Sequence, residues 1–399
     1  MAGGITADIA QDTAAQSSYQ SYMSEATRAK LGHTATLLSK WAGMDVIFIG
    51  PDDVDEGRNA PEESFVNNVM KQHPSYGDVG VNGKSLFEIQ TQHINTGGPH
   101  SVAITPGLID VLEKEDNIPI ERNAPLSREV CIVYNPWLDL SAEEIAAEKT
   151  HINGQPLYNV PGTSQEWNTI FNAHEIAGHC KNRDTEKTSD SDTYKVQNLR
   201  ESNADLEGIE QAREAGVSET TIDAFKDMNL LATVLPTSHL DHATGLDTMT
   251  PHAHPEHAEE TLTLKENFDK AVYKKFLGED ISRKYAEEID KKTPLEIRDD
   301  MADAAKGYPY AMAKLVIEVG ESPEVKEAPW YDASRMPKIM EHFSKAAEAH
   351  LKPPAAEAEK LQKETLAIEM DEVREDFVDE METPATKMPT ASLPPSLGR

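Results

Sequence analysis

Short apolar runs separated by turn residues characterise the first 160 residues of the chain. They occupy 44–50, 101–105 and 129–134, and each is rich in β-branched or aromatic residues. Runs of this length and composition are typical of buried strands. The pattern predicts a small mixed α/β lobe at residues 26–160, preceded by a polar, disordered arm at residues 1–25.

Helical spacing replaces this pattern after Pro161 and Gly162 and continues to about residue 350. Thr163 and Glu166 have the order of a capping box, and the apolar residues that follow share one helical face. Later helices are predicted at 195–215, 219–234, 258–276, 295–319 and 334–350. The sequence therefore predicts an α+β fold, in which the sheet lobe is followed by a mainly helical lobe at residues 161–350.

The C-terminal part of the chain divides into a helix and a tail. An apolar stripe runs along the otherwise acidic segment 351–382, formed by Leu366, Met370, Val373, Phe377 and Met381. This spacing predicts an amphipathic helix that docks on the body of the protein or on a partner. Residues 383–399 contain four prolines among Ser and Thr, which predicts a disordered tail.

The charge balance restricts the classes of partner. Seventy acidic residues against 38 basic residues give a net charge of −32 in a chain of 399 residues. Such a charge repels nucleic-acid phosphates and anionic lipid surfaces, so neither a nucleic acid nor a membrane is expected as a partner. No apolar run approaches the ~20 residues of a membrane span. Cationic peptides and metal ions are the favoured partners, although an acidic surface also serves solubility alone.

The cysteine content bears on the compartment. Cys131 and Cys180 are the two cysteines of the chain, too few for the dense disulfide framework of a small secreted protein. Residues 1–20 lack the basic and apolar regions of a cleaved leader. A reducing, cytoplasmic environment is therefore expected, with leaderless secretion as the alternative. Cys180 is expected to be a small buried filler.

A cluster of metal-ligand residue types follows the capped helix. His174 and Glu175 are followed by His179. Together they supply the two histidines and the glutamate of a hydrolytic zinc site. The two histidines are five positions apart, and on an ideal α-helix this spacing turns their side chains about 140° apart. A π-bulge would bring both imidazoles to one side, and Gly178 lies where a distortion costs little.

A third ligand is expected from the next helix. Glu201 lies on this helix, and Asp205 follows one turn later. A catalytic zinc site needs a third protein ligand and an open position for water, so Glu201 is predicted to complete it. Asp205 is predicted to accept the second N–H of a ligand histidine and so to fix its tautomer. One zinc ion per chain is expected, with Glu175 as the general base.

These two segments resemble the HExxGH-type gluzincins, the dipeptidyl-peptidase III family of metallopeptidases. That family pairs an H-E-x-x-G-H helix with an E-x-x-A-(D/E) helix, and residues 174–179 and 201–205 match both in order. The resemblance is confined to the zinc motifs. It implies a zincin-like catalytic lobe in which zinc binds to His174, His179 and Glu201, while Glu175 activates a zinc-bound water.

Further histidines offer additional roles in the sequence. His239 or His242 is predicted to stabilise a transition-state oxyanion, since zinc hydrolases often use a second donor of this kind, and an ordinary polar helix end is the competing interpretation. Tyr194, Tyr308 and Tyr310 are the alternatives, with ordinary packing as the competing role. A second metal could be held by His252, His254 and His257, but Pro251 and Pro255 favour a solvated loop at this place.

Taken together, the motifs predict a zinc metallopeptidase that acts on a peptide or protein substrate. The strand at 101–105 is a candidate for pairing with an extended substrate. Two alternatives remain: a non-catalytic acidic binding protein with a structural or vestigial zinc site, and a zinc amidase that acts on a non-peptide substrate. The sequence gives no indication of the oligomeric state.

Overall fold

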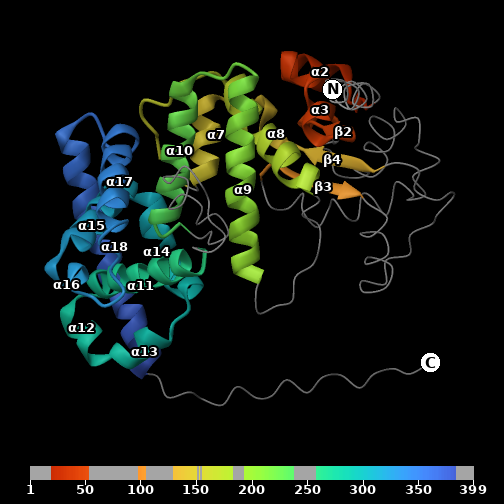
Figure 1. Cartoon of the computed structure of the whole chain (residues 1–399). Helices are drawn as coiled ribbons and strands as arrows, with labels where there is room; N and C mark the ends of the chain where they lie inside the picture. Colours follow the sequence, from red (N-terminus) through yellow and green to blue (C-terminus); the bar gives the residue numbers. More distant parts are fainter. Residues whose placement is uncertain are drawn as a thin grey trace, which may run out of the picture.

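The computed structural model describes residues 19–53, 98–104, 129–150, 152, 155–182, 193–237 and 258–382. Within these residues the chain has an α+β fold, as predicted, with a small mixed sheet at the N-terminal side and mostly helices after it. Figure 1 shows α9 (Thr193–Glu214) standing between the strands and the later helices. The predicted arm at 1–18 and tail at 383–399 lie outside the described residues.

The sheet has four strands in the order β1-β2-β4-β3. They are β1 (Ser21–Tyr22), β2 (Asp45–Ile49), β3 (His100–Ile104) and β4 (Val130–Tyr134). The first three in this spatial order are parallel, whereas β3 is antiparallel to β4. The three predicted strands are confirmed, and the two central ones, β2 and β4, are almost entirely buried.

The prediction that the loose arm extends to residue 25 was wrong at its end, because Ser21 and Tyr22 pair with Val46 and Ile47. The carboxylate of Asp45 also accepts a hydrogen bond of 2.8 Å from the backbone N–H of Gln20. A two-residue strand is too short to show a period-2 pattern, so this pairing could not be read from the sequence.

Three described helices before residue 160 were not predicted: two pack with the sheet, and the third belongs to the helical core. They are α2 (Glu25–Leu31), α3 (Leu38–Ala42) and α7 (Ala142–Thr150), with short 3₁₀ turns at Gly32–Thr36, Pro51–Asp53 and Pro136–Asp139. Each of the three is shorter than the roughly 11-residue window in which helical periodicity becomes readable. Local capping still marks α2, because the hydroxyl of Ser24 accepts a hydrogen bond from the backbone N–H of Thr27.

The remaining helices include the predicted ones in their predicted order, together with three short ones at 279–284, 286–291 and 323–326 that were not predicted. They are α8 (Ser164–Ala173), α9, α10 (Glu219–Val234), α11 (Ala258–Leu277), α12 (Glu279–Lys284), α13 (Ala286–Lys291), α14 (Pro294–Gly307), α15 (Pro309–Glu321), α16 (Pro323–Lys326), α17 (Met336–His350) and α18 (Ala356–Glu382). The capping box of Thr163 and Glu166 is present at α8. The single helix predicted at 295–319 was wrong: the chain breaks at Tyr308, because Pro309 can begin a helix but cannot continue one.

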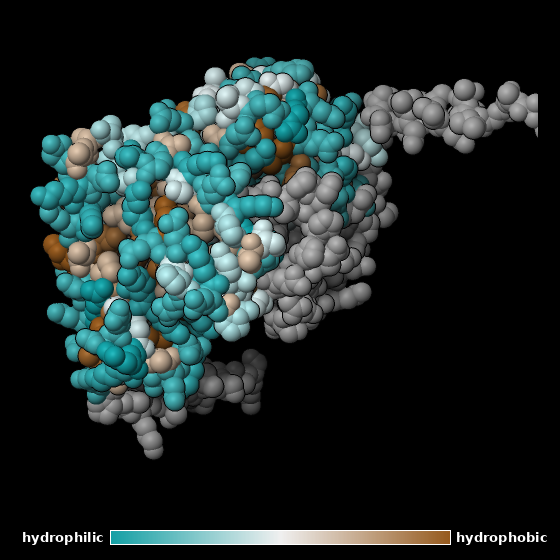
Figure 2. All heavy atoms as spheres, turned by 60° about the vertical axis from the view of Figure 1, so that its left-hand side comes forward, coloured by the Kyte–Doolittle hydropathy of each residue, from teal (hydrophilic) through white to brown (hydrophobic). Residues whose placement is uncertain are grey.

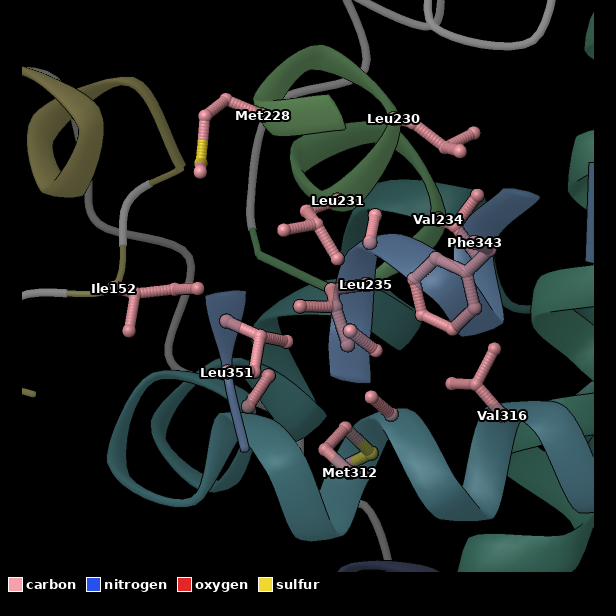
Figure 3. Close-up of a cluster of buried hydrophobic side chains, with 14 of the residues drawn as sticks. Ile152, Met228, Leu230, Leu231, Val234, Leu235, Met312, Val316, Phe343 and Leu351 are labelled. Carbon is pink, nitrogen blue, oxygen red and sulfur yellow. The ribbon is translucent and has the colours of Figure 1, made fainter. Parts of the chain in front are cut away.

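Two hydrophobic cores hold these elements together. The smaller one lies between the sheet, α2, α3 and the segment after α8, and the larger one fills the space among the later helices. Figure 3 shows part of the larger core, where side chains of α10, α15 and α17 meet around Leu235 and Phe343. The cores do not divide at residue 160: Trp137 and Ile145 belong to the helical core, whereas Ile176 and Cys180 belong to the sheet core.

The acidic helix α18 packs on the body of the protein, which is one of the two alternatives that the sequence predicted. Leu366 and Phe377 are buried in the helical core, and Met370, Val373 and Met381 pack against it. The face shown in Figure 2 is mostly hydrophilic, with small separated apolar patches. Among the described residues, no helix has both the length and the apolar character needed to cross a membrane.

Candidate metal centre

The segment His174–Cys180 forms a π-helix that continues directly from α8. The predicted departure from α geometry between the two histidines is therefore confirmed. A π turn closes a hydrogen bond between residues five apart, so side chains with this spacing come to the same side. The ring centroids of His174 and His179 are 4.9 Å apart, and their Nε2 atoms are separated by 3.2 Å.

One face of the π-helix rests on the sheet and the other rests on α9. Gly178 faces α9, where a Cβ added to it would lie 2.4 Å from the Cα atom of Ala204. Gly208, one turn further along α9, faces the backbone of His174 in the same way, because a Cβ added to it would lie 2.9 Å from the Cα atom of His174. The sequence explained Gly178 by cheap distortion, but the close approach of α9 is the constraint that this structure shows.

Glu201 on α9 lies opposite both histidines. Its Oε2 atom is 3.2 Å from Nε2 of His174 and 3.5 Å from Nε2 of His179. Ligand atoms around a tetrahedral zinc, each at about 2.0–2.1 Å from the metal, are about 3.3–3.4 Å from one another. The three atoms thus have the spacing of one face of such a tetrahedron, and the donor set fits zinc.

Exposure differs among the three side chains. The side chain of His174 is 6% exposed, whereas those of His179 and Glu201 are 17% and 20% exposed. The group is therefore buried on one side and reaches solvent on the other. A site for catalysis needs this arrangement, because a fourth position has to stay open for water or substrate.

A line of hydrogen bonds supports His174 from behind. Its Nδ1 atom lies 2.9 Å from Oδ1 of Asp205, and the amide of Asn229 on α10 donates to Oδ2 of the same carboxylate at 3.0 Å. Asp205 is fully buried. The contact between Asp205 and Nδ1 of His174 agrees with the prediction that Asp205 accepts a hydrogen bond from a ligand histidine. It leaves Nε2 of His174 directed toward Glu201. Burial lowers the pKa of His174, but its hydrogen bonds to Asp205 and Glu201 outweigh this effect and raise the pKa to about 9.

Glu175 lies beside the ligand group. Its Oε1 atom is 4.0 Å from Nε2 of His174, and its side chain is 10% exposed. Burial raises the pKa of this carboxyl group. The backbone carbonyl of Glu175 accepts a hydrogen bond of 2.8 Å from the hydroxyl of Ser101 on β3. Strand β3 is therefore attached to the π-helix at the residue predicted to be the base.

The two cysteines form a disulfide between Cys131 on β4 and Cys180 at the end of the π-helix. The prediction that Cys180 is a simple buried filler was wrong, although both residues are fully buried. Forty-nine residues separate them in sequence, and only the packing of the π-helix on the sheet brings them together. Structural disulfides persist mainly in oxidising environments, so this bond does not support the expectation of a reducing compartment.

Other predicted site residues have different outcomes. His239 and His242, as well as His252, His254 and His257, lie outside the described residues, as does the side chain of Tyr194. The hydroxyl of Tyr310 donates to Glu348, and that of Tyr308 donates to Glu369. Tyr310 is buried in the helical core and Tyr308 packs against it, which agrees with a packing role for both tyrosines.

No role was predicted for Gly208 or Asn229, and Ser101 was considered only as part of the strand at 101–105. A signal was available for Gly208, because Ala204 and Gly208 are four residues apart and present one small-residue face of α9. No local signal marks Ser101 or Asn229, since each acts on a residue of another element.

In comparisons with known proteins, no family model, no curated protein and no solved structure matches the chain.

Proposed function

We propose that this protein is a zinc-dependent hydrolase of peptide bonds, with zinc on His174, His179 and Glu201. The observation that carries the proposal is the convergence of their three donor atoms at 3.2–3.5 Å from one another. A structural zinc site is normally closed by four protein ligands. Here three ligands converge beside a buried carboxyl group, which favours catalysis over a purely structural role.

The side chains divide the chemical work. A zinc ion in such a site supplies a Lewis acid and makes a coordinated water acidic. Glu175 takes the proton of the attacking water and returns it to the leaving amine, and its raised pKa suits this exchange. Asp205 keeps His174 in the tautomer whose Nε2 lone pair faces the metal.

Strand β3 is the part of the sheet suited to bind a peptide. It pairs with β4 on one side, and no strand among the described residues pairs with its other side. Ser101 connects it to the backbone of Glu175, so a peptide added at this edge would run past the base. Main-chain hydrogen bonds at a sheet edge bind an extended peptide with little regard to its sequence, and the net charge of −32 favours cationic substrates.

The test compares metal content and hydrolysis in three proteins: the wild type, Glu175→Gln and Glu210→Gln. Glu210 is an exposed glutamate of α9 outside the site, so its variant controls for the loss of one carboxylate. Each protein is assayed on a mixed peptide pool before and after treatment with a chelator. We expect about one zinc per chain in all three, and a loss of at least ~10²-fold in hydrolysis in Glu175→Gln alone.

The outcomes separate the alternatives. Equal turnover by Glu175→Gln and wild type, with contaminating proteases excluded, would contradict the mechanism. Zinc without hydrolysis in the wild type would indicate a binding protein with a structural site. Cleavage of simple amides but of no peptide in the pool would indicate an amidase.

A further inference from the structure

The disulfide lies directly beside a residue of the metal centre. Cys180 follows His179 in sequence and is the last residue of the π-helix. Its partner Cys131 belongs to β4, which is bonded to β2 on one side and to β3 on the other. The covalent bond therefore joins the C-terminal end of the π-helix to an interior strand of the sheet.

Contacts on both sides hold the backbone around His179. On the side of α9, Gly178 touches Ala204 with no room for a Cβ atom. On the side of the sheet, Ile176, Ala177 and Cys180 pack in the smaller core with residues of β2 and β4. His179 thus lies between a residue fixed by close contact and a residue fixed by a covalent bond.

We propose that the Cys131–Cys180 disulfide is a positioning element of the metal centre, which keeps His179 in its ligand direction. This inference rests on the proposed zinc function. A π-helix is rare and holds one residue more than an α-helical turn, so its geometry depends on tertiary support. If the end of the segment is released, relaxation toward α geometry turns His179 toward about 140° from His174.

The redox state of the pair then controls zinc affinity. A phosphine reduces the bond by a balanced step: the S–S bond breaks, two S–H bonds form, and the phosphine takes up the oxygen of one water molecule. The reduced protein keeps every heavy atom and lacks only the covalent link. Loss of a support that orients a metal ligand typically lowers metal affinity by about 10–100-fold, and we expect this range here.

The experiment uses the full chain in five forms: oxidised wild type, phosphine-reduced wild type, C131A/C180A, Val133→Ala and His179→Ala. Val133 is a buried residue of β4 in the same core, so its truncation loosens the core without breaking the link. Zinc affinity is measured by competition with a chromogenic chelator after removal of the phosphine. Far-UV circular dichroism checks the fold, and the visible spectrum of bound Co²⁺ reports the ligand geometry.

We expect both forms without the link to bind zinc about 10–100-fold more weakly and to change the Co²⁺ spectrum, while Val133→Ala keeps the affinity and spectrum of the wild type. If C131A/C180A does not fold, the reduced wild type and a C131V/C180A variant provide the same comparison. Unchanged or tighter binding without the link, or an equal loss in Val133→Ala, would overturn the positioning role. Oxidised wild type that binds zinc no better than His179→Ala would instead refute the proposed function.

Discussion

Two buried groups of ionisable side chains in this protein differ in their geometry and in their exposure to solvent. In the helical core, Asp269 contacts Lys265, and its Oδ2 atom lies 3.4 Å from Nε of Arg298; these three side chains are at most 2% exposed. In the candidate metal centre, ligand-type atoms of His174, His179 and Glu201 converge, and the side chains of His179 and Glu201 are 17–20% exposed. The first group joins opposite charges and is sealed from water, whereas the second has the donors of a cation site and an open side.

This difference is the reason why we propose a structural role for the first group and a functional role for the second. A buried cluster of opposite charges contributes little beyond its packing, but it is costly to disrupt. Donor atoms that converge with an exposed side gain their stabilisation from a cation that comes from outside. Burial and charge alone would not have distinguished the two groups, whereas geometry and exposure do. Each of the following predictions tests one side of this comparison.

The largest effect is expected at Glu201. Its replacement by Ala removes one of the three proposed zinc ligands. Zinc affinity should therefore fall by well over ~100-fold, the upper loss that is typical when a residue hydrogen-bonded to a ligand is removed. Hydrolysis should be lost. Chelator competition measures the affinity, with Glu210→Ala as the control on the same helix. Full zinc occupancy of Glu201→Ala at low zinc would require a different third ligand.

A large effect on stability, but not on zinc, is expected at Asp269. Asp269→Ala leaves Lys265 and Arg298 buried without this carboxylate and should lower the free energy of unfolding by about 3–5 kcal/mol. Urea unfolding measures the change. Asp290→Ala breaks the exposed pair with Lys274, whose side chains are 38% and 60% exposed, and should change stability by no more than about 1 kcal/mol. Equal costs for the two variants would contradict the comparison.

A moderate effect is expected at Asp205. Asp205→Asn keeps the size of the side chain but weakens the charge-assisted hydrogen bond to His174, so zinc affinity should fall by about 10–100-fold. Asn229→Ala removes the donor to the same carboxylate and should produce a smaller loss. Metal titration measures both. A larger loss in Asn229→Ala than in Asp205→Asn would show that Asn229 acts by another route.

The smallest effect is expected in the pH dependence of stability. Burial, together with the nearby Arg298, lowers the pKa of Lys265 from 10.5 to about 7. Between these two values the unfolded chain binds more protons than the folded chain, so this residue makes stability rise with pH; below about pH 7 both states are protonated and its contribution is constant.

The change should be about 1 kcal/mol between pH 7 and pH 8. Urea unfolding at both pH values measures it as the difference between the wild type and Lys265→Met, which removes the titrating group. The same pH dependence in Lys265→Met and wild type would show that Lys265 does not titrate in this range.

The sequence by itself determined the features that depend on neighbours along the chain. Periodicity located α10 at its observed bounds of 219 and 234, and the capping box of Thr163 and Glu166 located the start of α8. The hypothesis that His174 and His179 bind one metal also predicted the π turn from their five-residue spacing, because backbone geometry fixes where side chains of a given spacing point.

Only the tertiary structure decided the features that depend on packing between distant segments. The Cys131–Cys180 disulfide, the contact of Gly178 with Ala204 and the bond from Asn229 to Asp205 each join residues that are 24 to 49 positions apart. Their side chains carry no local pattern that names the partner. The physical reason is that such contacts follow from how the π-helix, the sheet and α9 pack in three dimensions, whereas a sequence pattern reports only the period and the ends of each element.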